Sequence, residues 1–193
     1  MNKVAFITGA SRGIGREAAL AFARAGFDLA ISARTLNEGE QHEHALRDAA
    51  GAPLAGSLNG SADALRALGC RVLVVPMDLL DSDSALAACQ AVLAEYGRID
   101  VLINNAIYQG SDLNAGFMAL QAETLERMFQ GYILTPFLLT RAVAQHMVTR
   151  GSGVVINVTS GAGETDPPLP AGKGGWGMPM GRARRRCRAC PGC

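Results

Sequence analysis

The sequence predicts an α/β protein built on a doubly wound parallel sheet, and three observations lead to this fold class. Short, nearly continuous apolar runs recur along the chain, as expected of parallel strands covered on both faces. Segments with helical apolar spacing alternate with these runs, which favours right-handed crossovers between parallel strands. Apolar residues make up 49% of the 193 residues and aromatic residues only 5%, so the chain can bury one core rich in Ala, Leu and Val.

Five apolar runs are the predicted strands. Each run is short and is bounded by Gly, Pro or polar residues. In chain order they cover residues 3–8, 28–33, 71–78, 100–106 and 153–160. Beyond residue 160 the pattern dissolves into Gly and Pro, and we expect no further strand or amphipathic helix there.

Segments with helical spacing connect these strands. They cover residues 15–26, 62–68, 84–96 and 122–150, and the last is expected to bend or begin near Pro136. The connection over residues 35–61 is longer than most in α/β units, and we expect an additional helix over residues 40–49. His42 and His44 fall in this polar stretch and are expected to be solvated.

Charge is divided unevenly along the chain, whose formal net charge is +1. All acidic residues precede residue 171, whereas residues 171–193 hold six basic residues. The body is therefore mildly acidic, which argues against a nucleic-acid-binding face, and no apolar run reaches the roughly 18 residues of a membrane span. The opening MNKVAFITGA does not resemble a signal peptide, so we expect a cytoplasmic protein with Cys70 and Cys89 reduced and buried.

A glycine-rich turn, TGASRGIG over residues 8–15, joins the first predicted strand to the first predicted helix. Small residues there let backbone N–H groups approach a phosphate, and the start of a helix carries partial positive charge. The sequence therefore predicts a dinucleotide pyrophosphate site at this turn. Its predicted contacts are Gly9, Ser11, Arg12, Gly13, Ile14 and Gly15. Such a run can also be a simple tight turn, so the assignment depends on further motifs.

The spacing of that turn, G-x-x-x-G-x-G, resembles the short-chain dehydrogenase/reductase family, and three further segments agree in order. Asp78 and Leu79 follow the third predicted strand, where the family contacts the adenine ring. NNAI over residues 104–107 is similar to the family's N-N-A-G segment, with Ile107 in place of Gly. NVTSGAG over residues 157–163 is similar to the segment that carries the family's catalytic serine.

The resemblance implies a Rossmann-like NAD(P)-binding domain over residues 1–177, with about five of the family's seven strands present. It implies hydride transfer between a nicotinamide dinucleotide and a small alcohol or carbonyl substrate. It places the catalytic role at Ser160 and further cofactor contacts at Asp78, Leu79, Asn104, Asn105 and Ala106. Each has a structural alternative, because an Asp can cap a turn, an Asn can satisfy loop backbone and a Ser can end a strand. All lie at carboxyl ends of predicted strands, where open α/β sheets bind ligands.

Charge after the second strand favours NADP(H) as the cofactor, with NAD(H) as the alternative. An NAD site usually presents an acidic residue there to the ribose 2′-hydroxyl, whereas a 2′-phosphate favours arginine. Here the strand ends ISART, with Arg34 and no acid, and Arg12 lies in the glycine-rich turn. Guanidinium groups bind phosphate through charge-assisted hydrogen bonds. The alternative is that Arg34 is a solvated loop cation.

One part of the family's chemistry is missing from this sequence. In the family a tyrosine acts as acid or base, and a lysine four residues later lowers its pKa from about 10. No Y-x-x-x-K follows Ser160, because Tyr96, Tyr108 and Tyr132 all precede it. Tyr132 also stands where the family commonly carries an asparagine. The rival function is therefore a catalytically inactive nucleotide-binding or interaction module.

The last residues, GMPMGRARRRCRACPGC, do not read like the rest of the chain, and residues 178–193 are predicted to be a disordered tail. An Arg-rich arm for nucleic acid is one interpretation, and a metal site on its cysteines, one ligand short of closure, is another. We assign neither. The favoured hypothesis is a frameshift, because codons for MPMGRAR can be chosen so that another frame reads Ala-Tyr-Gly-Xaa-Ser-Lys, which contains Y-x-x-x-K. Intact family members are expected to be homo-oligomers, and a truncated chain gives no basis for expecting the same assembly.

Overall fold

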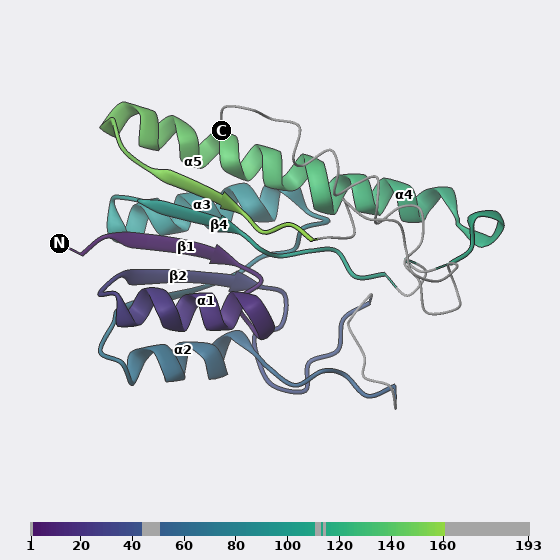
Figure 1. Cartoon of the computed structure of the whole chain (residues 1–193), viewed down its shortest axis with the longest axis horizontal. Helices are drawn as coiled ribbons and strands as arrows, with labels where there is room; N and C mark the ends of the chain where they lie inside the picture. Colours follow the sequence, from purple (N-terminus) through teal and green to yellow (C-terminus); the bar gives the residue numbers. More distant parts are fainter. Residues whose placement is uncertain (1, 44–50, 111–112, 114, 161–193) are drawn as a thin grey trace.

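Five strands form one parallel sheet in the computed structural model, which describes residues 2–43, 51–110, 113 and 115–160. The strands are β1 (Val4–Thr8), β2 (Asp28–Ala33), β3 (Val72–Pro76), β4 (Val101–Asn104) and β5 (Val154–Asn157). Their order across the sheet is β3-β2-β1-β4-β5, and every neighbouring pair is parallel (Figure 1). The predicted fold class is confirmed, and all five predicted strands lie where the sequence placed them.

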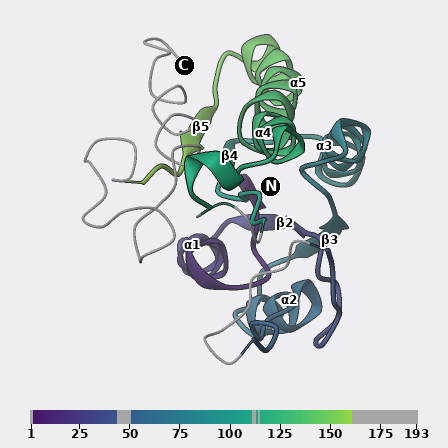
Figure 2. The same ribbon diagram turned by 90° about the vertical axis from the view of Figure 1, so that its right-hand side faces the viewer.

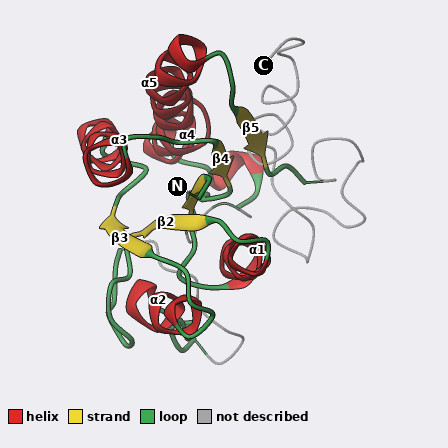
Figure 3. Ribbon diagram, turned by 90° about the vertical axis from the view of Figure 1, so that its left-hand side faces the viewer, coloured by secondary structure: helices red, strands yellow, loops and turns green. Residues whose placement is uncertain are grey.

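Helices cover the two faces of this sheet. On one face lie α1 (Gly13–Arg24) and α2 (Leu58–Arg66), and on the other lie α3 (Ser82–Tyr96) and α5 (Thr135–Arg150), as Figures 2 and 3 show. The chain winds outward from β1 to β3 and then crosses to β4 on the other side of β1. Strand order therefore reverses between β1 and β4, and ligands of open α/β sheets bind at the carboxyl ends of the strands at such a point.

Alternate side chains of the central strand fill the two layers. Val4 and Phe6 pack in the cluster that includes α3 and α5, whereas Ala5 and Ile7 pack in the cluster with α1 and α2. Phe6 and Ile7 are fully buried. Full burial of such a side chain is worth about 1.5–3 kcal/mol relative to exposure. Burial on both faces explains why this strand reads as an unbroken apolar run.

β5 departs from the prediction that every strand is covered on both faces. It pairs with β4 at the edge of the sheet, and Val154 and Ile156 are 55% and 40% exposed. Val155, by contrast, packs against the layer that contains α3 and α5. An apolar run does not by itself reveal which faces its neighbours cover. The position of a strand in the sheet decides that. Because no further strand is expected after residue 160, the sequence also predicts that this strand is an unprotected edge, and the described part of the structure confirms that prediction.

The long helix expected over residues 122–150 is interrupted. A π-helical turn at Gln130–Leu134 separates α4 (Ala122–Phe129) from α5, and Pro136 lies in the first turn of α5. Because the residues before α5 are themselves helical, Pro136, which has no N–H, interrupts the hydrogen-bond pattern of the helix at this point. The Gln130 side chain donates a hydrogen bond to Ser82 Oγ at 2.6 Å, which holds the interruption against the start of α3.

The additional helix expected over residues 40–49 is wrong for residues 40–43, which are not helical. The rest of that segment, with His44, lies outside the described residues, as does the predicted tail. The Glu40 carboxylate instead accepts a hydrogen bond from Leu36 N–H at 2.7 Å. A local side-chain contact thus overrides weak helical propensity. None of the helices in the described ranges is long and apolar enough to span a membrane.

Asp100, just before β4, joins β1, β4 and α5 at the amino ends of the strands. Its carboxylate accepts hydrogen bonds from Val4 N–H at 2.8 Å, from Arg98 at 2.6 and 2.8 Å and from Arg150 at 3.2 Å. Burial raises the pKa of this carboxyl, but the hydrogen bonds from Arg98, Val4 and Arg150 outweigh burial and lower the pKa to about 2. A carboxylate that is only 8% exposed is thereby kept charged and paired.

Candidate functional site

A cavity of about 350 Å³ opens at the carboxyl ends of β1 to β4. Each of the four strands contributes the residues that immediately follow it. The lining consists of residues 9 and 11–14 after β1, 33–35 and 42 from β2 onward, 77–80 after β3, and 105–109 after β4. The cavity therefore lies at the switch point that the strand order defines.

Most of the predicted site residues lie on this cavity. Those that line it are Gly9, Ser11, Arg12, Gly13, Ile14, Arg34, Asp78, Leu79, Asn105 and Ala106. Gly15, Asn104 and Ser160 do not line it. The motifs that are separated in sequence are thus brought together, although the contact of each residue with a cofactor stays a prediction.

Two glycines allow the strand ends and α1 to approach one another closely. Gly9 has a φ of +71°, and a Cβ there would lie 2.8 Å from Ala106 Cα. A Cβ on Gly15 would overlap the Gly9 carbonyl oxygen and the Asn105 side chain. Gly15 is therefore a packing residue below the cavity floor, because only hydrogen fits between α1 and the end of β1.

The start of α1 faces this glycine-rich turn without a capping side chain. Arg12 is the N-cap residue, in extended conformation, and makes no side-chain hydrogen bond to the helix. The first N–H groups of a helix have no intrahelical partner and carry partial positive charge. Helix starts of this kind bind phosphate, so the turn fits an anionic group.

Thr8 organises the turn from below and was missed in the sequence reading. Its hydroxyl donates to Ile103 O at 3.2 Å and accepts from the N–H groups of Asn105 and Ala106 at 3.1 and 3.0 Å. The residue is 2% exposed. One hydroxyl thereby sets the path of the chain where it leaves β4 for the cavity wall. A threonine at the last position of a strand, before the first glycine, is the signal that could have identified it.

The two asparagines after β4 make internal hydrogen bonds. The side-chain amide of Asn105 donates to Thr8 O at 3.0 Å and Gly9 O at 3.3 Å while the residue lines the cavity. The amide of Asn104 donates to Thr140 Oγ1 and Asn157 Oδ1, both at 2.9 Å, and so links β4 to α5 and β5. Asn105 therefore satisfies backbone oxygens and lines the cavity as well, whereas Asn104 bonds two side chains, and contact of either residue with a cofactor stays a prediction.

Asp78 and Leu79 lie on the cavity side of the turn after β3. Asp78 Oδ1 accepts a hydrogen bond from Leu80 N–H at 2.9 Å, and Asp78 N–H donates to Ser84 Oγ at 2.9 Å. Asp78 therefore caps its own turn and lines the cavity as well. Leu79 is 9% exposed and adds apolar surface to the same wall.

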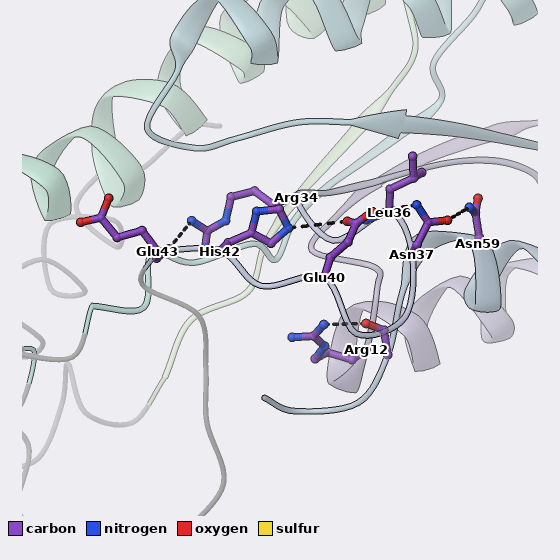
Figure 4. A network of polar contacts seen from close by, with 9 residues as sticks. Arg12, Arg34, Leu36, Asn37, Glu40, His42, Glu43 and Asn59 are labelled. Carbon is purple, nitrogen blue, oxygen red and sulfur yellow. Dashed lines mark hydrogen bonds and ion pairs between the residues drawn. The ribbon is translucent and has the colours of Figure 1, made fainter. Parts of the chain in front are cut away.

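Three basic residues line the cavity: Arg12 from the turn after β1, and Arg34 and His42 from the segment after β2. Arg12 Nη2 donates to Gly56 O at 2.5 Å, and Arg34 Nη1 donates to Glu43 O at 3.0 Å (Figure 4). The expectation that His42 is merely solvated is wrong. The loop after β2 runs back to the cavity, and His42 is one of the residues that line it. The His42 side chain is 31% exposed.

Two acidic side chains of the loop after β2 accept hydrogen bonds from other residues of that loop. Glu40 accepts hydrogen bonds from Leu36 N–H and from the Asn37 side chain, both at 2.7 Å. These contacts, that of Leu36 foremost, lower the pKa of the Glu40 carboxyl. Glu38 accepts from Gly56 N–H at 2.8 Å. Both carboxylates therefore stabilise the loop that carries the basic residues.

The described residues contain one member of the predicted catalytic group. Ser160 is half-buried and lies just beyond the carboxyl end of β5. Tyr96 donates from its hydroxyl to Leu29 O, and burial raises its pKa to about 12, so it is a poor base. Tyr132 donates to Tyr108 O at 2.7 Å. Tyr108 is 3% exposed and lines the cavity.

Comparison with known proteins agrees with this arrangement. Residues 3–56 and 52–171 match the family model described as short chain dehydrogenase. Human dehydrogenase/reductase SDR family member 7 is 32% identical over 169 residues, which are 88% of this chain and 44% of that protein. The 2-(R)-hydroxypropyl-CoM dehydrogenase of Xanthobacter autotrophicus is 32% identical over 164 residues, which are 83% of this chain and 57% of that protein.

Solved structures give the same result. A metagenomic short-chain oxidoreductase in complex with NADP superposes with a TM-score of 0.73 at 27% identity, over 94% of this chain and 70% of that one. The chain spans about half the length of the two relatives named above. Because the family model covers most of the chain, this chain belongs to the short-chain dehydrogenase/reductase family.

Proposed function

We propose that this chain binds a nicotinamide dinucleotide in the cavity at the carboxyl ends of β1 to β4. The observation that carries the proposal is the glycine-rich turn, where Gly9 and Gly15 leave room for close approach and α1 begins without a side-chain cap. That turn would hold the pyrophosphate. Ile14 and Ile107, 68% and 36% exposed on the cavity, offer apolar contact to the rings of the ligand.

NADP(H) is the form of the cofactor that the charges support best. Arg12 and Arg34 line the cavity where the ribose of a dinucleotide reaches the end of β2, and guanidinium groups suit a 2′-phosphate. The acidic residues that could instead accept a ribose 2′-hydroxyl, Glu38 and Glu40, are held by backbone N–H groups of the loop. The similar short-chain oxidoreductase solved with NADP supports binding of a nicotinamide dinucleotide in general.

The reaction proposed for the site is hydride transfer between NADP(H) and an alcohol or carbonyl substrate. The cofactor supplies the hydride chemistry. Ser160, beyond the end of β5, would hold the reacting oxygen with its hydroxyl. Because no Y-x-x-x-K follows Ser160 in the printed sequence, the group that would move the proton is missing. We therefore expect slow turnover or none, and a nucleotide-binding module without turnover is the second candidate.

Titration of the purified chain with NADPH and NADH, followed by a carbonyl-reduction assay, tests these proposals. We expect NADPH to bind more tightly than NADH. Binding without turnover supports the nucleotide-binding module, whereas turnover shows that the missing tyrosine and lysine are replaced by other groups. Absence of binding by both nucleotides, in a chain that circular dichroism shows to be folded, would overturn the proposal.

A further inference from the structure

We propose that His42 is a third basic residue of the 2′-phosphate subsite and that it makes the preference for NADP(H) depend on pH. This inference rests on the proposed function, because it needs a dinucleotide in the cavity. Its basis is a juxtaposition that the sequence did not predict. His42, eight positions beyond Arg34, lines the same cavity as Arg34 and Arg12.

The imidazole of His42 lies on the cavity with one ring nitrogen left without a hydrogen bond among the described residues. Its Nε2 atom is buried and has no hydrogen-bond partner within the part of the chain that the structure describes. Figure 4 shows this nitrogen directed at Glu40, with the other edge of the ring on the side of Arg34. A polar atom that is buried without a partner is costly, so a ligand that brings the ring a partner is favoured.

Glu40 lies near His42 but does not satisfy it. Glu40 Oε2 is 3.7 Å from His42 Nε2, which is beyond the usual hydrogen-bond distance of about 2.7–3.2 Å. The same carboxylate already accepts from Leu36 N–H and Asn37. Glu40 is therefore held by the loop and does not close on the imidazole.

Other charged groups line the same cavity as His42. They are Arg12 and Arg34, and Asp78 on the wall formed after β3. Glu43, next in sequence to His42, accepts the hydrogen bond of Arg34 through its backbone oxygen. A phosphate dianion placed among these groups changes the balance, because it attracts all three basic side chains at once.

The direction of the pH effect follows from proton linkage. A histidine ordinarily gains its proton near pH 6.5, and a nearby dianion favours the protonated form. Binding of NADPH should therefore take up a proton above about pH 6.5, and its affinity should fall as the pH rises. The second ionisation of a phosphate monoester has its midpoint near pH 6, and its completion at higher pH would strengthen binding, so a fall in affinity between about pH 6.5 and 8.5 has the sign expected of the histidine.

The test measures dissociation constants of NADPH and NADH for the full chain across that range. We expect the affinity for NADPH to fall about fivefold from pH 6.5 to 8.5 and the affinity for NADH, which lacks the phosphate, to stay constant. Calorimetry of the unmodified chain in two buffers of different ionisation enthalpy should detect proton uptake with NADPH only. This second measurement does not depend on a variant that folds.

Variants separate a ligand contact from a structural role. His42→Asn should bind NADPH weakly at every pH, whereas His42→Arg should bind it tightly at every pH, because its charge does not titrate. His146→Asn, on α5 and away from the cavity lining, should keep the pH dependence of the unmodified chain.

The outcomes distinguish this inference from the proposed function. NADPH binding that is independent of pH, or a pH dependence that His42→Asn retains, would overturn the role of His42 and leave the nucleotide site intact. Failure of both nucleotides to bind would overturn the proposed function and this inference together.

Discussion

At the scale of single residues, Thr8 shows how one buried hydroxyl shapes the site. It connects the end of β1 with the backbone that leaves β4, through Ile103 O and the N–H groups of Asn105 and Ala106. These two N–H groups belong to the first residues of the segment 105–109, which forms one wall of the cavity. The position of that wall therefore depends on a side chain that does not line the cavity.

Replacing Thr8 by valine should reveal this dependence. Thr8→Val keeps the shape but removes the acceptor of two backbone N–H groups, so we expect the free energy of unfolding to fall by about 2 kcal/mol. NADPH should also bind more weakly, because the wall is no longer held. Urea unfolding and nucleotide titration measure the two effects. Thr8→Ser retains the hydroxyl and is the control; equal loss in both variants would contradict the role given to the hydroxyl.

Arg34 is the residue that should decide between the two cofactors. Arg34→Ala removes a charge-assisted contact worth about 1.5–3 kcal/mol, so we expect NADPH to bind about tenfold to a hundredfold more weakly. NADH should be nearly unaffected. Arg16→Ala, which removes an exposed side chain paired with Glu17, is the matched control. An equal loss for both nucleotides would show that Arg34 acts on the fold of the loop and does not read the phosphate.

At the scale of elements, the approach of α1 to the strand ends determines whether the glycine-rich turn can exist. A Cβ at Gly15 would overlap the Gly9 carbonyl oxygen, which is backbone and cannot turn aside. The sequence predicted Gly15 as a cofactor contact, yet its described role is to allow α1 to begin against β1. The glycine pattern lies where the sequence placed it, and a contact between Gly15 and a cofactor stays a prediction.

Gly15→Ala should therefore damage both the fold and the site. Overpacking of this kind costs about 1–3 kcal/mol, and we expect a loss of that size in urea unfolding together with at least tenfold weaker NADPH binding. Gly116→Ala is the control, because Gly116 has a φ of −63° and nothing lies within 4 Å of its added Cβ. If Gly15→Ala leaves the free energy of unfolding unchanged, α1 can move away from the end of β1, and the close packing at Gly15 does not constrain the fold.

Element boundaries show where reasoning from sequence stops. The spacing of the apolar residues predicted the positions of the helices. These include the long segment over residues 122–150, which in the structure consists of α4, a π-helical turn and α5. The interruption itself depends on Gln130, whose amide bonds Ser82 on a different helix. Such a contact cannot be read from local periodicity, because its partner is distant in the chain. The same holds for residues 40–43, where hydrogen bonds within the loop replaced the expected helix.

At the scale of the whole molecule, Asp100 joins elements from both ends of the described chain. It pairs with Arg98 beside β4, with Arg150 at the end of α5 and with Val4 N–H of β1. The Asp100 pKa, about 2, is below the ordinary value of 3.8. A carboxyl group whose pKa is lower in the fold than in the unfolded chain stabilises the fold when the pH is above its unfolded-chain pKa. That stabilisation is lost as the pH falls toward the pKa of the folded state.

Acid should therefore weaken the fold through Asp100. We expect the free energy of unfolding to fall by about 2 kcal/mol between about pH 5 and pH 2 from this group alone. Asp100→Asn should lack this part of the pH dependence and be less stable at neutral pH, because Arg98 and Arg150 lose their partner. Urea unfolding at a series of pH values measures both. Asp63→Asn, at an exposed pair with Arg66, should change stability by less than about 1 kcal/mol, and an equal effect there would contradict the assignment.

The relation of this chain to its family also belongs to this scale. It spans about half the length of the relatives compared, and its sequence has no Y-x-x-x-K after Ser160. The Arg- and Cys-rich tail, residues 178–193, lies outside the described residues. The frameshift therefore stays a hypothesis, and sequencing of the locus tests it: an intact frame through Cys193 to a stop codon, without Y-x-x-x-K in another frame, would refute it.

The sequence by itself determined the class of the sheet, the position of its five strands, the family and the turn that forms the floor of the site. These follow from local period and from motifs at strand ends, which are properties of short segments. Tertiary structure decided which of those residues meet. It brought His42 to the cavity, assigned Asn104 and Gly15 to packing and hydrogen bonding, and made Thr8 the support of one wall. The reason is physical: contacts between residues far apart in the chain depend on how strands and helices pack, and no local pattern records them.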